Sequence, residues 1–139
     1  MGSAEEANKA AAKAFFAAVD AVDRKAVFEL LDAEYRMTMP GTGAVVGRDE
    51  HWRFIETMKG AMDDMTHTAE IVAAEGEYVF TQGRASGTHT GPLAGHAATG
   101  RKSDARFINV LRFREGRIVE LFSLMDNVTL GLQLGFDPL

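Results

Sequence analysis

A few side chains of this 139-residue sequence could transfer protons, and none of them is a cysteine. His89 stands within Gly87-Thr88-His89-Thr90-Gly91, at the expected end of a strand, where an imidazole could act as a general base. The same histidine also suits a structural role, in which its hydrogen bonds end the strand. The other histidines, His51, His67 and His96, are not spaced like metal ligands on a helix or hairpin, so we expect no metal site and no cofactor.

Asp126 and Tyr35 are the other candidates for proton transfer. Asp126 follows an apolar strand and precedes Asn127-Val128-Thr129, the position of a helix N-cap, where a carboxylate accepts a backbone N–H. The same carboxylate could instead act as an acid or base at a pocket rim, and both interpretations stay open. Tyr35 could donate a proton, although a tyrosine at the edge of a core is common. The adjacent Asp63-Asp64 is typical of a solvated helix end.

The apolar pattern predicts the elements that position these groups. Helical spacing predicts a first helix over about 4–19, a second after Asp23 that buries residues as far as Leu31, and a third from about residue 48. The remaining pattern has a period of two. It predicts strands over about 35–39, 44–46, 66–74, 77–89, 102–113 and 117–125, with a terminal helical turn over 130–134.

The hairpin around Glu115-Gly116 is apolar on both faces. One face carries Phe107, Asn109, Leu111, Phe113, Val119, Leu121, Ser123 and Met125. Three helices packed on a strongly curved, mostly antiparallel sheet give an α+β cone with an apolar pocket between helices and sheet. The other face would form an exposed patch on a monomer, so we expect a homodimer through the outer sheet face, unless the first helix covers part of it. This patch comprises Ile108, Val110, Ile118, Phe122 and Leu124.

Composition predicts one domain over residues 1–139, with residues 1–3 treated as a cloning remnant. No segment is long and apolar enough for a membrane span, and the first residues lack the pattern of a signal peptide. A net charge of −5 disfavours binding to nucleic acid. We therefore expect a cytoplasmic protein that binds neither nucleic acid nor membrane.

Several motifs occur in the order and spacing of the SnoaL-like polyketide cyclases. They are Gly87-Thr88-His89-Thr90-Gly91-Pro92-Leu93-Ala94-Gly95, Thr99-Gly100-Arg101, Gly116-Arg117-Ile118-Val119-Glu120, Asp126 and Leu134-Gly135. The sequence resembles this family from about Phe15 to Gly135, which implies the cone-shaped nuclear transport factor 2-like fold and a cyclase without a cofactor. Family members such as the founding cyclase use an aspartate on the last strand and a histidine on the preceding one. An ungapped match places Ser123 and Asn109 at these positions.

This departure from the family pattern implies a different mechanism. Neither a serine hydroxyl nor an asparagine amide exchanges protons near neutral pH, but both can hold or polarise a substrate through hydrogen bonds. Together with Asp126-Asn127-Val128-Thr129, the pattern resembles the indane-forming cyclase of the indanomycin pathway, for which a cycloaddition is proposed. We therefore expect a cyclase that folds a hydrophobic polyketide substrate and activates it by hydrogen bonding. The candidate catalytic residues are Asn109, Ser123, Asp126 and His89.

A set of large side chains is predicted to contact the substrate. It consists of Tyr35, Met37, Met39, Trp52, Met58, Met62, Phe107, Leu121 and Met125. Methionine can mould around a large hydrophobic ligand, although it also fills gaps in ordinary cores. The loop over residues 91–100, with glycines at both ends, is a candidate lid.

Other functions fit the same residues. An isomerase, dehydratase, aldol cyclase or epoxide-opening enzyme would use Asp126 or His89 as acid or base, and its rate would follow a titration curve. A carrier of a hydrophobic metabolite would bind its ligand without changing it, and a structural domain would have a filled pocket.

Overall fold

The computed structural model describes residues 3–136. Its helices are α1 (Ser3–Asp20), α2 (Arg24–Leu30), α3 (Arg48–Ala61) and α4 (Asn127–Leu134). Its strands are β1 (Leu31–Thr38), β2 (Val45–Val46), β3 (Thr66–Glu75), β4 (Tyr78–Thr88), β5 (Lys102–Arg114) and β6 (Arg117–Met125). Of the residues treated as a cloning remnant, 1 and 2 lie outside the described residues, and Ser3 begins α1.

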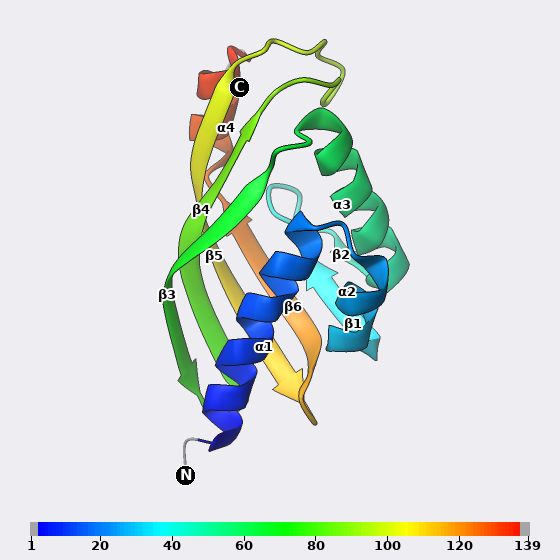
Figure 1. Cartoon of the computed structure of the whole chain (residues 1–139), viewed down its shortest axis with the longest axis vertical. Helices are drawn as coiled ribbons and strands as arrows, with labels where there is room; N and C mark the ends of the chain where they lie inside the picture. The colour runs from blue at the N-terminus through cyan, green and yellow to red at the C-terminus, as the bar shows by residue number, and fades with distance from the viewer. Residues whose placement is uncertain (1–2, 137–139) are drawn as a thin grey trace.

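The strands form one six-stranded sheet in the order β2-β1-β6-β5-β4-β3. Only β1 and β6 run parallel, and every other neighbouring pair is antiparallel. The sheet curls without closing, and α1 crosses its concave face with α2 and α3 beside it (Figure 1). The predicted α+β cone is confirmed.

The main core lies between α1 and the sheet. Successive phenylalanines near the end of α1, Phe15 and Phe16, are buried, and the ring of Phe16 is 5.4 Å from that of Phe107 on β5. α1 contacts β3 and β4, α3 contacts β1, and α2 contacts β1 and β6. Because α1 lies on the inner face, the outer face of the sheet is left uncovered.

The strand register confirms the predicted inner face of the hairpin. Asn109 pairs with Ser123, and on either side of this pair Leu111 faces Leu121 and Phe107 faces Met125. Alternate side chains of an antiparallel pair share one face, so these residues project together into the cone. A one-residue slip would have turned both polar groups outward.

Three details of the sequence prediction are wrong. β1 begins directly after α2 at Leu31, four positions before the predicted start, because Leu31 is buried as a strand residue. The last helix begins at Asn127 rather than 130. Ile118 is fully buried instead of belonging to the outer patch, because an irregularity in the β5–β6 register between Arg112 and Phe113 turns it inward.

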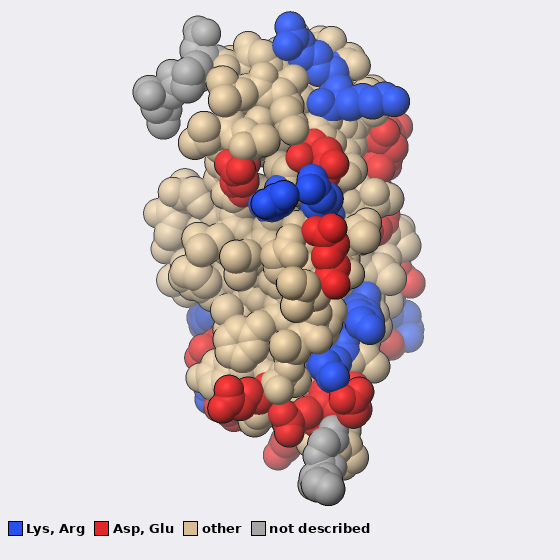
Figure 2. All heavy atoms as spheres, turned by 90° about the vertical axis from the view of Figure 1, so that its left-hand side faces the viewer, with Lys and Arg blue, Asp and Glu red and all other residues tan. Residues whose placement is uncertain are grey.

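The outer sheet face carries exposed large apolar side chains. They are Ile71, Tyr78, Phe80, Ile108, Phe122 and Leu124. Figure 2, viewed from the side where β3 and β4 lie in Figure 1, shows a wide area without charged side chains beside a row of acidic and basic groups. No helix within residues 3–136 is both long enough and apolar enough to cross a membrane.

Candidate active site

A cavity of about 380 Å³ lies between α1, α3 and the inner face of the sheet. Most of its lining is apolar, and five methionines contribute to it: Met37, Met58, Met62, Met65 and Met125. Such flexible, polarisable side chains adapt to a bulky hydrophobic ligand. The volume is sufficient for a bicyclic or polyene molecule.

A row of polar side chains crosses the inner sheet beneath this cavity. Thr81, Asn109 and Ser123 occupy paired positions on β4, β5 and β6, so their Cβ atoms are cross-strand neighbours. Asn109 and Ser123 line the cavity. Asn109 Oδ1 and Thr81 Oγ1 are buried and have no hydrogen-bond partner in residues 3–136. A buried polar atom without a hydrogen-bond partner is unfavourable.

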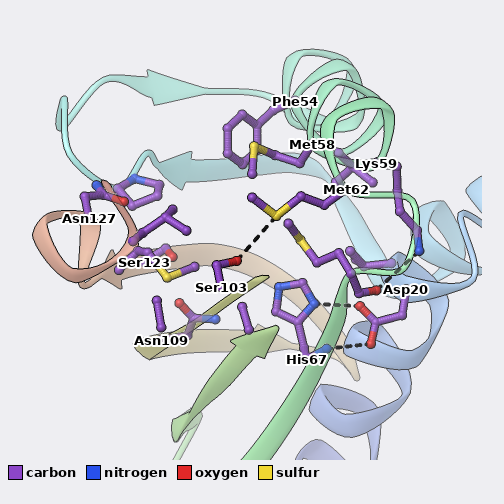
Figure 3. A pocket seen from close by; sticks show the side chains of 18 of the residues that line it. Asp20, Phe54, Met58, Lys59, Met62, His67, Ser103, Asn109, Ser123 and Asn127 are labelled. Atoms are coloured by element: carbon purple, nitrogen blue, oxygen red, sulfur yellow. Dashed lines mark hydrogen bonds and ion pairs between the residues drawn. The ribbon is translucent and has the colours of Figure 1, made fainter. Parts of the chain in front are cut away.

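A carboxylate and a histidine form a dyad at the wall where α1 meets β3. Asp20 Oδ1 is 2.6 Å from Nδ1 of His67, and Asp20 Oδ2 accepts the backbone N–H of His67 at 2.8 Å. Less than a fifth of each side chain is exposed, and both line the cavity. Figure 3 shows the His67 ring between Asp20 and the polar row of the sheet. The aspartate therefore fixes both the ring and the main chain that carries it.

The hydrogen bond to Asp20 determines what His67 presents to a ligand. A carboxylate can only accept, so Nδ1 of His67 carries the hydrogen and donates it. In the neutral ring Nε2 then has a free lone pair, and it has no protein partner in the described part of the chain. An imidazole oriented in this way by a carboxylate is suited to act as a general base.

A second histidine of the cavity lining, His51 on α3, pairs with Tyr35 on β1. The Tyr35 hydroxyl is 2.9 Å from Nδ1 of His51, and the two rings stack 5.8 Å apart. Burial raises the pKa of Tyr35 well above its usual value. Burial, with a smaller contribution from the nearby His67, lowers the pKa of His51 to about 4. Both side chains are therefore neutral at physiological pH, and the ring of His51 lines the cavity.

The structure brings many of the predicted site residues together. Those that line the cavity are Asn109, Ser123, Met37, Met58, Met62, Leu121 and Met125. They come from β1, α3 and its C-cap Met62, β5 and β6, and the parallel contact between β1 and β6 brings Met37 opposite Leu121.

His89 lies elsewhere, and its placement corrects the prediction that it reaches a substrate. It is fully buried, with Nδ1 2.9 Å from Thr99 Oγ1 and its ring edge-on to Phe136 at 5.7 Å. Its backbone N–H donates to the carbonyl of Arg101, and its own carbonyl accepts from Gly100, each at 2.8 Å. The histidine closes the base of the loop over residues 91–100, which is the structural interpretation of the motif.

Asp126 is the N-cap of α4 and does not line the cavity. Its carboxylate accepts the hydroxyl of Thr129 at 2.6 Å and the backbone N–H of the same residue at 3.0 Å. These hydrogen bonds lower the pKa of Asp126 below its usual value. The geometry is that of a helix cap, and the predicted alternative as an acid or base at the pocket rim is not what the structure shows.

The remaining predicted contacts are part of the core rather than of the cavity lining. Tyr35 lies behind His51, and Phe107 packs against α1. Met39 is half-buried against the main core, and Trp52 packs edge-on against Phe28 with ring centroids 6.3 Å apart. These four side chains are not among the residues that line the cavity, so their predicted contact with substrate stays a prediction.

The loop over residues 91–100 contributes Leu93 and Ala94 to the lining. His96 stacks on Phe136 with ring centroids 3.8 Å apart, and Phe136 itself lines the cavity. The loop and the chain after α4 therefore close one end of the cavity together.

Three residues of the site were missed from the sequence: Asp20, His67 and His51. The sequence spacing of His51 and His67 bears only on metal binding, and no group of three or more His, Asp or Glu side chains within residues 3–136 is placed to hold a metal ion. A usable signal was present, because His67 stands near the start of a predicted strand and faces inward with Ala69. Asp20 ends the first helix, one turn beyond Phe16.

Comparison with known proteins gives a family whose fold agrees with the one described above. The model of the SnoaL-like polyketide cyclase family matches residues 9–134. IdmH from Streptomyces antibioticus, a candidate polyketide cyclase, is 29% identical, with a TM-score of 0.85 over 92% of this chain and 98% of that one. No curated protein matches the sequence.

Two further solved structures share the fold at lower identity. A candidate SnoaL-like polyketide cyclase from Jannaschia sp. CCS1 is 19% identical, with a TM-score of 0.89 over 99% of this chain and 98% of its own. AclR from Streptomyces galilaeus, a candidate hydroxylase, is 21% identical, with a TM-score of 0.86 over 96% of this chain and 88% of its own. The family match spans nearly all of the chain, and the cone with its lined cavity fits it: this chain belongs to the SnoaL-like polyketide cyclase family.

Proposed function

We propose that this protein closes a ring in a linear, largely apolar polyketide by proton transfer, with His67 as the base. Membership of the family supports a cyclase or isomerase role. The observation that carries the proposal is the dyad of Asp20 and His67, in which a carboxylate leaves Nε2 of His67 available at the cavity wall. It provides the ionisable group that is missing at Asn109 and Ser123.

The proposed reaction is an intramolecular aldol closure. Nε2 of His67 takes a proton from a carbon beside a ketone, and the electron pair left on that carbon is delocalised as an enolate. The amide nitrogen of Asn109 is on the side of its residue nearer His67 in Figure 3, where it can donate to the enolate oxygen. The enolate carbon then bonds to a second carbonyl carbon, and the resulting alkoxide takes the proton back from the His67 imidazolium.

The cavity supplies the rest of the catalysis by holding the chain folded. Bringing both carbonyl groups into contact removes much of the entropy cost of ring closure, worth up to about 7–11 kcal/mol in ideal intramolecular systems. The methionine-rich walls accept an apolar chain. Exclusion of water also protects the enolate from premature protonation.

A synthetic 1,5-diketone tests the proposal. 1-(2-Naphthyl)hexane-1,5-dione forms a six-membered ring by aldol closure when its terminal methyl carbon bonds to the carbonyl carbon beside the naphthyl group. The same methyl carbon exchanges hydrogen for deuterium when a base removes a proton from it. We expect the wild-type protein to accelerate both exchange and ring closure over buffer. His67→Gln should slow both by about 100-fold or more, which is the usual contribution of a positioned general base. His96→Gln is the matched control, because His96 does not line the cavity.

Unchanged exchange and closure in His67→Gln would refute the proposal, as would a wild-type protein that accelerates neither. A second candidate function then gains support: ring closure by cycloaddition, without proton transfer, guided by Asn109 and Ser123. This alternative is favoured by their placement in the cavity and by the similarity to IdmH. It predicts that Asn109→Ala slows ring formation from a linear polyene about tenfold while His67→Gln has no effect.

A further inference from the structure

Two histidines line the cavity, and the proposed proton transfer uses only one of them. His51 enters from α3, with its side chain almost entirely buried, and Tyr35 from β1 lies behind it without any exposed surface. The hydroxyl of Tyr35 and Nδ1 of His51 are 2.9 Å apart. The partner of His51 is a neutral hydroxyl, whereas the partner of His67 is a carboxylate, so the two histidines have different roles.

The pairing with Tyr35 determines which nitrogen of His51 carries the hydrogen. The Tyr35 hydroxyl has one partner in the described part of the chain, Nδ1 of His51. A buried hydroxyl hydrogen without an acceptor is unfavourable, so Tyr35 donates and Nδ1 accepts. The hydrogen of the neutral ring is then on Nε2. That nitrogen has no partner within residues 3–136 and keeps some accessible surface, and its ring belongs to the cavity lining.

Adjacent phenylalanines of α1 pack against the two histidines, one against each. The ring of Phe16 stacks on His67 at 5.8 Å, whereas the ring of Phe15 lies 6.1 Å from that of His51. Phe15 and Phe16 also contact each other edge-on at 5.8 Å. Each imidazole therefore packs against its own phenylalanine, with a proton acceptor on His67 and a hydrogen-bond donor on His51.

We propose that His51 donates its Nε2–H to the oxygen of the carbonyl group whose carbon forms the new carbon–carbon bond, and that Tyr35 positions His51 by fixing its tautomer. This inference rests on the proposed aldol closure. As the bond forms, the π electrons of the accepting carbonyl move to its oxygen, which the Nε2–H stabilises without giving up its hydrogen. The proton that finally neutralises the oxygen comes from the His67 imidazolium.

The arrangement also specifies the substrate class. One carbonyl group must acidify the carbon that faces His67, and a second must reach the donor of His51. The proposed substrate is therefore a chain with two ketone groups that can approach these two walls together. A substrate with one carbonyl group would exchange its α-hydrogen at His67 but would gain nothing from His51.

A labelled ketone tests the donor directly. The probe is 2-acetylnaphthalene with ¹³C at the carbonyl, whose resonance moves downfield when its oxygen accepts a hydrogen bond. We expect a downfield shift on binding to the wild-type protein. The double variant His51→Leu with Tyr35→Phe removes the donor and leaves no hydroxyl without an acceptor, and the bound shift should disappear. Tyr35→Phe alone frees the tautomer, so the shift should decrease only in part.

Trp52→Phe is the matched control for a substitution on α3, because Trp52 lies outside the cavity lining, and it should keep the full shift. A full shift in the double variant would overturn the proposal, and so would a wild-type protein that does not bind the ketone. A second measurement is independent of any ligand: ¹⁵N resonances should show Nδ1 of His51 without hydrogen and Nε2 with it. The opposite tautomer would also refute the inference.

The two proposals fail in different experiments. Deuterium exchange of the diketone reports on His67 alone, whereas the carbonyl resonance and the ring nitrogens report on His51. If exchange is lost in His67→Gln but the tautomer of His51 is reversed, the base survives and the donor does not. If the tautomer and the carbonyl shift are as expected but exchange does not need His67, the aldol closure fails and His51 is left without the role assigned to it.

Discussion

Replacing His51 with asparagine should remove a specific part of the pH dependence of stability. Burial lowers the pKa of His51 to about 4 in the folded protein, whereas an unfolded histidine titrates near about 6.5. Between these values the unfolded chain binds a proton that the folded chain does not. Stability from this group is therefore complete above about pH 6.5 and is lost progressively as the pH falls towards 4.

The size of the effect follows from the two pKa values. Proton linkage gives a loss of about 2 kcal/mol of unfolding free energy between pH 7.5 and pH 5.0. Below pH 4 the loss reaches a limit of about 3 kcal/mol, because both states are then protonated. In His51→Asn the amide oxygen can still accept the Tyr35 hydroxyl, but the side chain does not titrate.

Urea unfolding, followed by the fluorescence of the single tryptophan, Trp52, measures this difference. The asparagine variant should be less stable than wild type at pH 7.5, and this deficit should shrink by about 2 kcal/mol at pH 5.0. His96→Asn is the control, since His96 is exposed, and its stability should follow that of wild type at both values of pH. An equal deficit of His51→Asn at pH 7.5 and pH 5.0 would refute the argument that burial holds His51 neutral.

Three further predictions concern stability and assembly. Asp126→Ala should lower the melting temperature by removing the cap of α4, whereas Asp126→Asn should keep it nearly unchanged, as a thermal scan would show. Gly83→Ala should destabilise the fold by about 1–3 kcal/mol in urea unfolding, because the added Cβ would lie 2.1 Å from the carbonyl oxygen of Thr68. The exposed sheet face should form a homodimer, so light scattering should give twice the chain mass for wild type and a monomer for Ile108→Glu with Phe122→Glu; a monomeric wild type would contradict this.

The sequence predicted the sheet well because strand register and turn position depend on residues that are close together in the chain. The alternation of apolar and polar residues on β5 and β6, with Gly116 at a positive φ in the turn between them, leaves one register in which the apolar faces match. That register places Asn109 opposite Ser123. The irregularity that turns Ile118 inward has no such signal, because it depends on how β5 and β6 pair after the turn.

The pairing of Asp20 with His67 could not be derived from local pattern, although the inward-facing strand position of His67 could. Asp20 and His67 are 47 positions apart in sequence, and they meet only because α1 packs across β3. Nothing near Asp20 in the chain distinguishes it from a solvated aspartate at a helix end. His89, by contrast, stands in a glycine-flanked motif that is easily recognised in the sequence. The motif marks the loop that His89 closes through its backbone hydrogen bonds, and not a reactive nitrogen.

Asp20 has two oxygens with two different tasks, since one holds the ring of His67 and the other holds its main chain. The carboxylate thus joins the last residue of α1 to the second residue of β3, which is 47 positions later in the sequence. The orientation of His67 therefore depends on the docking of the first helix on the edge strand of the sheet. Any substitution that loosens this helix should reduce turnover before it measurably reduces the amount of folded protein, so activity would be a more sensitive gauge of helix docking than a melting curve.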